Sequence, residues 1–146
     1  MKRIAFALLA LAGPLAAQAP DMASTIEYRQ GIYKAIRWNW GPLAQMVQGK
    51  APFVRADFVK RATRISFLSH QLLEGYPPGA HEGAVTDALP AIWENFDDFS
   101  AKLDSFKLEA RNLRLVAESG DEPAIKQQFI KTAGTCKACH DKYKAD

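Results

Sequence analysis

Residues 89–117 read LPAIWENFDDFSAKLDSFKLEARNLRLVA, and this stretch decides the fold class. Its apolar residues recur at alternating intervals of three and four positions, which is typical of one face of a helix in a helical bundle. The pattern predicts one long helix that begins near Leu89-Pro90, since proline suits a first turn. The positions that keep the spacing are Leu89, Ile92, Phe96, Phe99, Leu103, Phe106, Ala110, Leu113 and Ala117.

The same spacing recurs in three further stretches, and none of the chain shows sustained period-2 alternation. In residues 24–48 it is interrupted at Gly41-Pro42, where a proline without an N–H predicts a kink or a break. We call such a row of apolar positions along one helix face a seam. The second seam is weaker and ends at Gly75, before the longest loop. A fourth helix starts at Asp121, which is its N-cap. The sequence thus predicts an all-α, antiparallel up-down-up-down four-helix bundle. The three seams are Ile26, Arg29, Tyr33, Ile36, Trp40, Leu43, Val47; Phe58, Ala62, Ile65, Leu68 or Ser69, Leu72; and Ile125, Phe129, Thr132, Cys136, Cys139, Tyr143.

The first 19 residues have the features of a cleaved secretory signal. A basic start at Lys2 and Arg3 is followed by an apolar run from Ile4 to Ala12, too short to span a bilayer. Cleavage is expected after Ala19, with cleavage after Ala17 as the alternative, which leaves one exported domain over 20–146. The formal charge of +3 falls by two, to +1, when the signal is removed. We therefore expect no nucleic-acid partner and no membrane insertion of the mature protein.

The only two cysteines of the chain stand in the motif Cys136-Lys137-Ala138-Cys139-His140. This spacing matches the attachment site of a c-type haem. Two thiols three positions apart can bond the two vinyl groups of one haem, and the next imidazole reaches the iron. The motif predicts one covalent haem c per chain, attached through Cys136 and Cys139, with His140 as an axial ligand.

Three other readings of the motif stay open at this stage. A redox-active Cys-x-x-Cys pair calls for a preceding strand and a helix N-terminus beneath it. A zinc site needs a further ligand, such as His81 or His70, at no recognisable spacing. A simple disulfide between neighbouring cysteines leaves His140 unexplained. Only six residues follow His140, so a sixth iron ligand would have to come from upstream. The candidates are Met22, Met46, His70, His81 and the residues of the first seam.

The chain resembles the cytochrome c prime family, the class II cytochromes c, over residues 21–146. The resemblance is carried by Tyr28 to Tyr33 (YRQGIY), by Trp38 to Pro42 (WNWGP) and by Cys136 to Tyr143. It implies a periplasmic four-helix bundle with haem attached near the C-terminus. It also implies a homodimer formed through the first two helices, near which Trp38, Phe53 and Phe58 lie.

The resemblance further implies which residues contact the haem. Tyr33 falls on the distal side, Arg29 near a propionate, Gln30 beside them, and Lys144 where the family commonly has a proximal arginine. A propionate would neutralise the one charge in an apolar seam; the alternative is that Arg29 reaches water at a bundle end. Lysine keeps the charge but lacks the planar fork of arginine.

No methionine stands near Tyr33, and Met46 lies roughly 20 Å further along the helix. We therefore expect a five-coordinate, high-spin iron with Tyr33 packed over the vacant position, although a direct tyrosine ligand stays open. Such a site favours NO and CO and permits one-electron transfer. The alternative function is a dedicated periplasmic electron carrier in a respiratory or photosynthetic chain, whose redox partner the sequence does not name. No pattern of catalytic residues is present, so we do not expect an enzyme.

Overall fold

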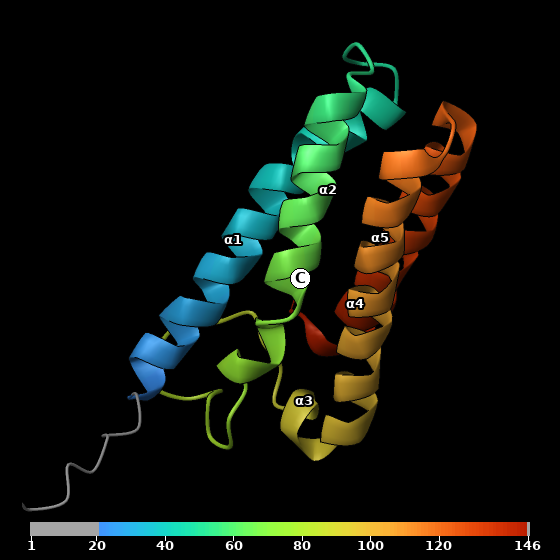
Figure 1. Ribbon diagram of the computed structural model, residues 1–146. Helices are drawn as coiled ribbons and strands as arrows, with labels where there is room; N and C mark the ends of the chain where they lie inside the picture. Colours follow the sequence, from blue (N-terminus) through green and yellow to red (C-terminus); the bar gives the residue numbers. More distant parts are fainter. Residues whose placement is uncertain (1–20, 146) are drawn as a thin grey trace, which may run out of the picture.

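The structure is a computed structural model that describes residues 21–145, so the predicted signal segment 1–19 lies outside the described residues. Four long helices pack in two antiparallel pairs, α1 with α2 and α4 with α5, and α2 also packs on α4 (Figure 1). Two short helices and their connecting segments cover one end of the bundle. The elements are α1 (Met22–Val47), α2 (Arg55–Ser69), the 3-10 helix η1 (Leu72–Gly75), α3 (Ala91–Glu94), α4 (Phe96–Ser119) and α5 (Glu122–Tyr143).

The helix starts follow from local side-chain chemistry. The Asp21 carboxylate accepts a hydrogen bond from the Ser24 amide at 2.9 Å, and Asp121 accepts one from the Ala124 amide at 2.8 Å. Both satisfy backbone donors that a first helical turn leaves free. The prediction that Asp121 caps the fourth helix is confirmed. Within residues 21–145 no helix is both long enough and apolar enough to cross a membrane.

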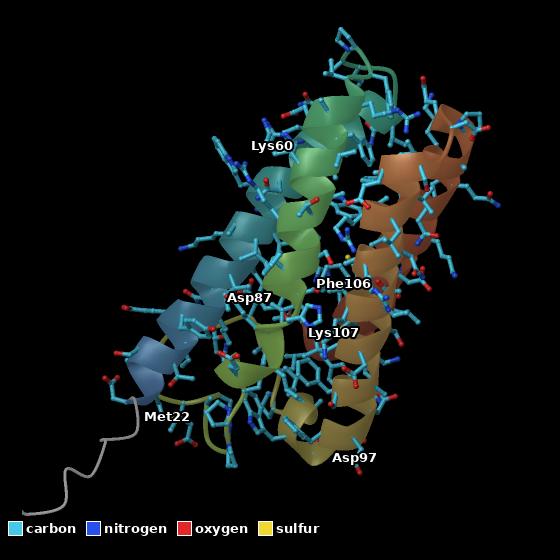
Figure 2. The ribbon with its side chains drawn as sticks, viewed as in Figure 1. Met22, Lys60, Asp87, Asp97, Phe106 and Lys107 are labelled. Atoms are coloured by element: carbon cyan, nitrogen blue, oxygen red, sulfur yellow. The ribbon has the colours of Figure 1, made fainter. Side chains whose placement is uncertain are left out.

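The predicted seams form the core, so the four-helix bundle is confirmed. Phe58 and Leu113 are fully buried, and Phe106 of α4, labelled in Figure 2, is 7% exposed. Trp40 of α1 stacks on Phe129 of α5 with ring centroids 4.2 Å apart, which joins the two helix pairs. Burial of these apolar faces supplies the main driving force for the fold.

Two details of the helix prediction are wrong. Of the kink or break expected at Gly41-Pro42, the break does not occur, because α1 continues to Val47 with Pro42 inside it. Gly41 and Trp38 are exposed there, so water can satisfy the Trp38 carbonyl that Pro42 leaves without an intrahelical donor.

The helix predicted from Leu89 is instead divided at Asn95 into α3 and α4. The Asn95 side chain donates to the Ala91 carbonyl at 3.1 Å, which is the kind of bond by which asparagine competes with helix hydrogen bonding. The break turns Phe96 outward, and this predicted core residue is 36% exposed.

A buried carboxylate joins α4 to α5. Glu109 is 8% exposed, and its oxygens accept hydrogen bonds from Gln128 at 2.7 Å and Lys131 at 2.9 Å. The Thr132 hydroxyl donates to the Glu109 backbone carbonyl at 3.2 Å. Both the charge and the hydrogen-bonding capacity of this carboxylate are thus satisfied within the protein.

The end of α5 is tied to the segment before α3. The Leu89 amide donates to the Tyr143 carbonyl at 3.0 Å, and the Ala145 amide donates to the Asp87 carbonyl at 2.8 Å. Ala88 and Lys144 form an isolated antiparallel bridge between these two contacts. The residues that follow the Cys-x-x-Cys-His motif are therefore held against the loop end of the bundle.

Candidate functional site

The last turns of α5 carry the two thiols and the imidazole of the predicted haem motif. Cys136 and Cys139 are partly buried free thiols that pack against the core, and the Cys136 thiol donates to the Thr132 carbonyl at 3.7 Å. His140 lies one turn beyond Cys136 on the same helix and is exposed. One helix therefore carries all three side chains at positions three and four residues apart, as the motif requires.

The electrostatic surroundings of the thiols differ from those of a redox-active pair. Burial raises the pKa of Cys136 to about 11, and burial also raises the pKa of Cys139. Reactive cysteines in oxidoreductases have a lowered pKa instead. Partial desolvation of the ring, with the Lys144 ammonium, lowers the pKa of His140, which favours the neutral imidazole that binds metals.

The predicted distal residue, Tyr33, lies on α1 and meets a second tyrosine. The Tyr76 hydroxyl donates to the Tyr33 hydroxyl at 3.2 Å. Burial raises the pKa of Tyr33 well above its ordinary value, and the negative charge of an ionised Cys139 would raise it further. Tyr76 belongs to the core cluster, and Tyr33, Cys136 and Cys139 all pack against that cluster.

Arg29 is a buried cation, 2% exposed, on the same face of α1. One terminal nitrogen, Nη1, donates to the carbonyls of Gly75 at 3.1 Å and Ala80 at 2.5 Å. The other, Nη2, donates to the Thr86 hydroxyl at 2.8 Å. All three partners are neutral, and within residues 21–145 Arg29 forms no salt bridge. The alternative in which Arg29 reaches water is wrong.

The other two predicted haem contacts lie at the edge of this region. The Gln30 amide donates to the Val85 carbonyl at 2.9 Å, so Gln30 helps Arg29 to hold the loop before α3. Lys144 is exposed just past α5, with its ammonium 3.5 Å from the Asp87 carboxylate. The structure places Lys144 close enough to His140 to lower the pKa of that imidazole.

The sequence analysis missed the partners that the loop supplies to Arg29 and Tyr33. Tyr76 packs its ring 4.9 Å from the Arg29 guanidinium and 6.0 Å from the Trp93 ring. Gly75 approaches Arg29 so closely that a Cβ at this position would clash with the arginine side chain. The loop has no periodicity, so the only signal was its glycine and aromatic content.

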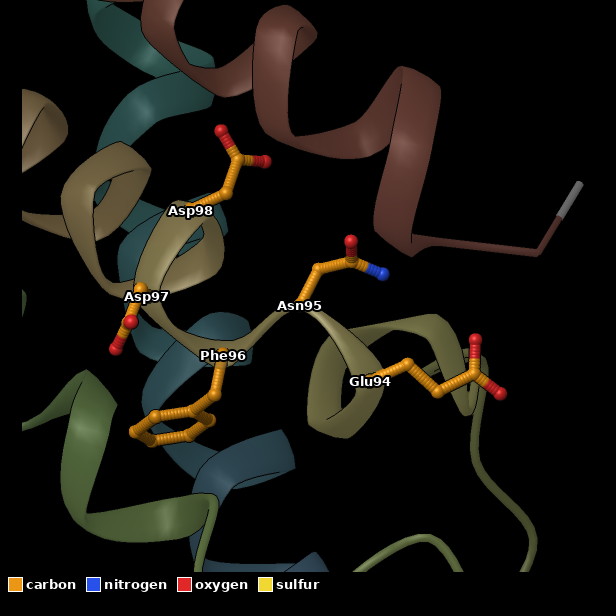
Figure 3. A pocket seen from close by; sticks show the side chains of 5 residues that line it. All are labelled: Glu94, Asn95, Phe96, Asp97 and Asp98. Carbon is orange, nitrogen blue, oxygen red and sulfur yellow. The ribbon is translucent and has the colours of Figure 1, made fainter.

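Two surface pockets formed by the described residues lie away from this region. One is lined by side chains around the junction of α3 and α4, and Figure 3 shows that they come from consecutive positions: Glu94, Asn95, Phe96, Asp97 and Asp98. A second lies beside Trp38 on α1. Neither contains a predicted site residue.

The zinc site and the disulfide, two of the alternative interpretations of the cysteine motif, find no support in the positions of these side chains. His81 packs at a tilt against Trp93 with ring centroids 4.9 Å apart, and His70 is exposed at the end of α2. Across residues 21–145 no three histidine, cysteine or acidic side chains gather where they could hold a metal ion. Both cysteines are free thiols, not a disulfide.

A four-helix bundle with Cys-x-x-Cys-His at the end of its last helix defines a class of protein, the helical c-type haem proteins. Residues 24–144 match the family described as Cytochrome C'. The chain is 38% identical over 119 residues to a cytochrome c prime from Rubrivivax gelatinosus, which covers 82% of this chain and 92% of that relative. The chain belongs to the cytochrome c prime family.

Solved structures agree with this assignment. Cytochrome c prime from Shewanella frigidimarina superimposes with a TM-score of 0.84 at 39% identity, covering 88% of this chain and all of that one. A nitric oxide complex of a variant of cytochrome c prime from Alcaligenes xylosoxidans superimposes with a TM-score of 0.80 at 27% identity, covering 88% and 99%.

The family implies a c-type haem, and the residues present fit one. When bound, haem supplies an iron that accepts ligands and exchanges one electron. The thiols of Cys136 and Cys139 and the imidazole of His140 are the side chains that would hold it. Arg29 gives independent support, because a cation buried among neutral groups lacks the counter-charge that a propionate carboxylate provides.

Proposed function

We propose that this protein is a periplasmic haem c protein with a five-coordinate, high-spin iron that binds NO and CO and can transfer one electron. The observation that carries the proposal is the hydrogen-bonded pair of phenols, Tyr33 and Tyr76, which lies at the same core cluster as Cys139. Of the two methionines within residues 21–145, Met46 is buried further along α1 and Met22 lies beside Gly83 at the start of α1. The nitric oxide complex of the related Alcaligenes xylosoxidans protein supports the ligand class.

The optical spectrum of the purified protein tests this proposal. We expect a high-spin spectrum in both oxidation states and a change in the reduced spectrum when CO or NO is added. A reduced spectrum that neither gas alters contradicts gas binding and favours the dedicated electron carrier. Tyr33→Met sharpens the test, because a thioether at this position should give a low-spin iron and lower the CO affinity.

Covalent attachment is tested separately. Mass spectrometry should find haem on the peptide that contains residues 136–140. Cys136→Ala and Cys139→Ala should each keep one thioether bond, and the double variant should release its haem on denaturation. A wild-type peptide without added mass contradicts the haem assignment.

We propose export as well, with cleavage between Ala19 and Pro20. Asp21 caps α1 beyond this point, so cleavage there, or at the alternative position after Ala17, leaves the first helix complete. The intact mass of the mature protein from a periplasmic extract tests the site. Retention of residues 1–19 contradicts it.

We propose that two copies associate through α1 and α2. Trp38 of α1 supports this, because its side chain is 76% exposed and large exposed aromatic groups are enriched at interfaces. Phe58, in contrast, is fully buried in the monomer and cannot contribute. Sedimentation of Trp38→Ser, with and without CO, should show a monomer where the wild type is a dimer. Ile130→Ser, on an exposed part of α5, is the control, and equal sedimentation of all three contradicts the proposal.

A further inference from the structure

The two buried tyrosines form a directed hydrogen bond. When two hydroxyl groups form a hydrogen bond with each other, the more acidic O–H is the better donor. Burial raises the pKa of Tyr76, but its bond to Tyr33 and the positive charge of Arg29 act against this rise. For Tyr33 burial, the charge of Tyr76 and the bond to Tyr76 all raise the pKa, and Arg29 has the smallest effect. The structure has Tyr76 as the donor and Tyr33 as the acceptor at 3.2 Å, and Tyr76 is the phenol that packs against the Arg29 cation.

The position of Arg29 explains this asymmetry. Its guanidinium carbon lies 4.9 Å from the centroid of the Tyr76 ring, and the three hydrogen bonds to the loop fix it there. A cation over the face of a phenol withdraws electron density from the ring and makes its O–H a better donor. Arg29 and Tyr76 thus act on Tyr33 as one assembly.

Because Tyr33 accepts the hydrogen bond from Tyr76, its own hydroxyl hydrogen is left without an acceptor within residues 21–145. Among the described residues the Tyr33 hydroxyl has Tyr76 as its single hydrogen-bond partner. On either side of Tyr33 along α1, Ile32 and Ile36 are buried and offer no side-chain acceptor. A hydroxyl in such surroundings gains most from an acceptor atom that enters the site, because it has no competing partner there.

We propose that Tyr76, held by Arg29, positions Tyr33 as a hydrogen-bond donor to a ligand on the haem iron, so that the site favours NO over CO. This inference rests on the gas binding proposed above. Bound NO accepts a hydrogen bond better than bound CO does, since it carries more negative charge on its outer atoms. Tyr33 would contact the ligand, and Tyr76 is a positioning residue that acts through it.

The test compares NO and CO dissociation from the reduced holoproteins of the wild type and three variants. Tyr33→Phe keeps the ring and removes the donor, so NO should leave about tenfold faster, the loss expected for one hydrogen bond. Tyr76→Phe should accelerate NO release several-fold, and CO release should change less than twofold in both. Tyr28→Phe, which removes an exposed hydroxyl bonded to Glu74 at 2.8 Å, is the matched control and should behave as the wild type.

The outcomes separate the inference from the function on which it rests. Equal changes in NO and CO release indicate altered packing and overturn the donor role, and so does no change in either. An effect of Tyr33→Phe without one of Tyr76→Phe overturns the positioning role of Tyr76. A wild type that binds neither gas overturns the proposed function and this inference together. Should Tyr33→Phe not accumulate with haem, the N–O stretching frequency of the wild type in D₂O decides, because an unshifted band excludes the hydrogen bond.

Discussion

Arg29 and Glu109 are both buried charges in the core of the same bundle, yet their surroundings differ. Glu109 on α4 meets the Lys131 ammonium at 2.9 Å, so its charge is neutralised by the protein. Arg29 on α1 has three hydrogen bonds, all to neutral oxygens. The difference teaches that a buried charge with its counter-charge is part of the framework. One without a counter-charge fits the haem propionate that we propose as its partner.

The largest effect that sharpens this contrast is expected from Arg29→Met. The change leaves the carbonyls of Gly75 and Ala80 and the Thr86 hydroxyl without their donor, and we expect a loss of about 3 to 5 kcal/mol in the free energy of unfolding. Denaturant unfolding of the holoprotein measures it. The control Arg37→Met, at an exposed position of the same helix, should stay within about 0.5 kcal/mol. Equal losses of unfolding free energy in the two variants would contradict the distinction between Arg29 and an ordinary exposed arginine.

Gly75→Ala tests the close approach between the loop and Arg29. The added methyl group would clash with the Arg29 side chain, so we expect a loss of about 1 to 3 kcal/mol. Gly31→Ala serves as the control, because its Cβ would meet no atom within 4 Å. An alanine inside a helix is favoured over glycine, and this variant should gain about 0.5 to 1 kcal/mol. Thermal unfolding measures both, and a neutral Gly75→Ala contradicts the observed contact.

Glu109→Gln should have a smaller effect than Arg29→Met. The amide keeps an oxygen for Gln128 and loses the charge that attracts Lys131, whose ammonium can return to water, so about 1 to 2 kcal/mol should be lost. Chemical unfolding at neutral pH gives the value. A cost as large as that of Arg29→Met would show that neutralisation does not distinguish the two sites.

The smallest effect concerns the pH dependence of the Glu109 contribution. Burial acts to raise its pKa, but the hydrogen bonds from Gln128, Lys131 and Asn112 outweigh burial, and its pKa lies below the ordinary value of 4.5. A lowered pKa in the folded state means that the stabilisation is present above pH 4.5 and is lost as the pH falls through the folded pKa. Melting temperatures between pH 6 and 3 should therefore fall less in Glu109→Gln than in the wild type. Parallel profiles would contradict this.

The parts of the molecule that the sequence predicted are those with a regular period or a fixed motif. The seams of α1, α2 and α5 and the placement of Cys136, Cys139 and His140 on one helix follow from spacing alone. The division at Asn95 was missed, because a single side-chain bond to Ala91 overrides an unbroken apolar pattern. Tyr76 was missed because its bond to Tyr33 spans 43 residues from a loop without periodicity. Packing of the whole chain decides such contacts, and no local pattern encodes them.

The bonds of Arg29 also bear on the order in which the chain folds. They join residues 46, 51 and 57 positions apart, whereas those between Glu109 and α5 span 19 and 23. Closing a longer loop costs more entropy before any contact compensates for it. The α4 and α5 hairpin should accordingly form early and the loop that surrounds Arg29 late. Changes at Arg29 should then act mainly on the unfolding rate, so the loop around Arg29 should be both the last part of the bundle to assemble and the first to open.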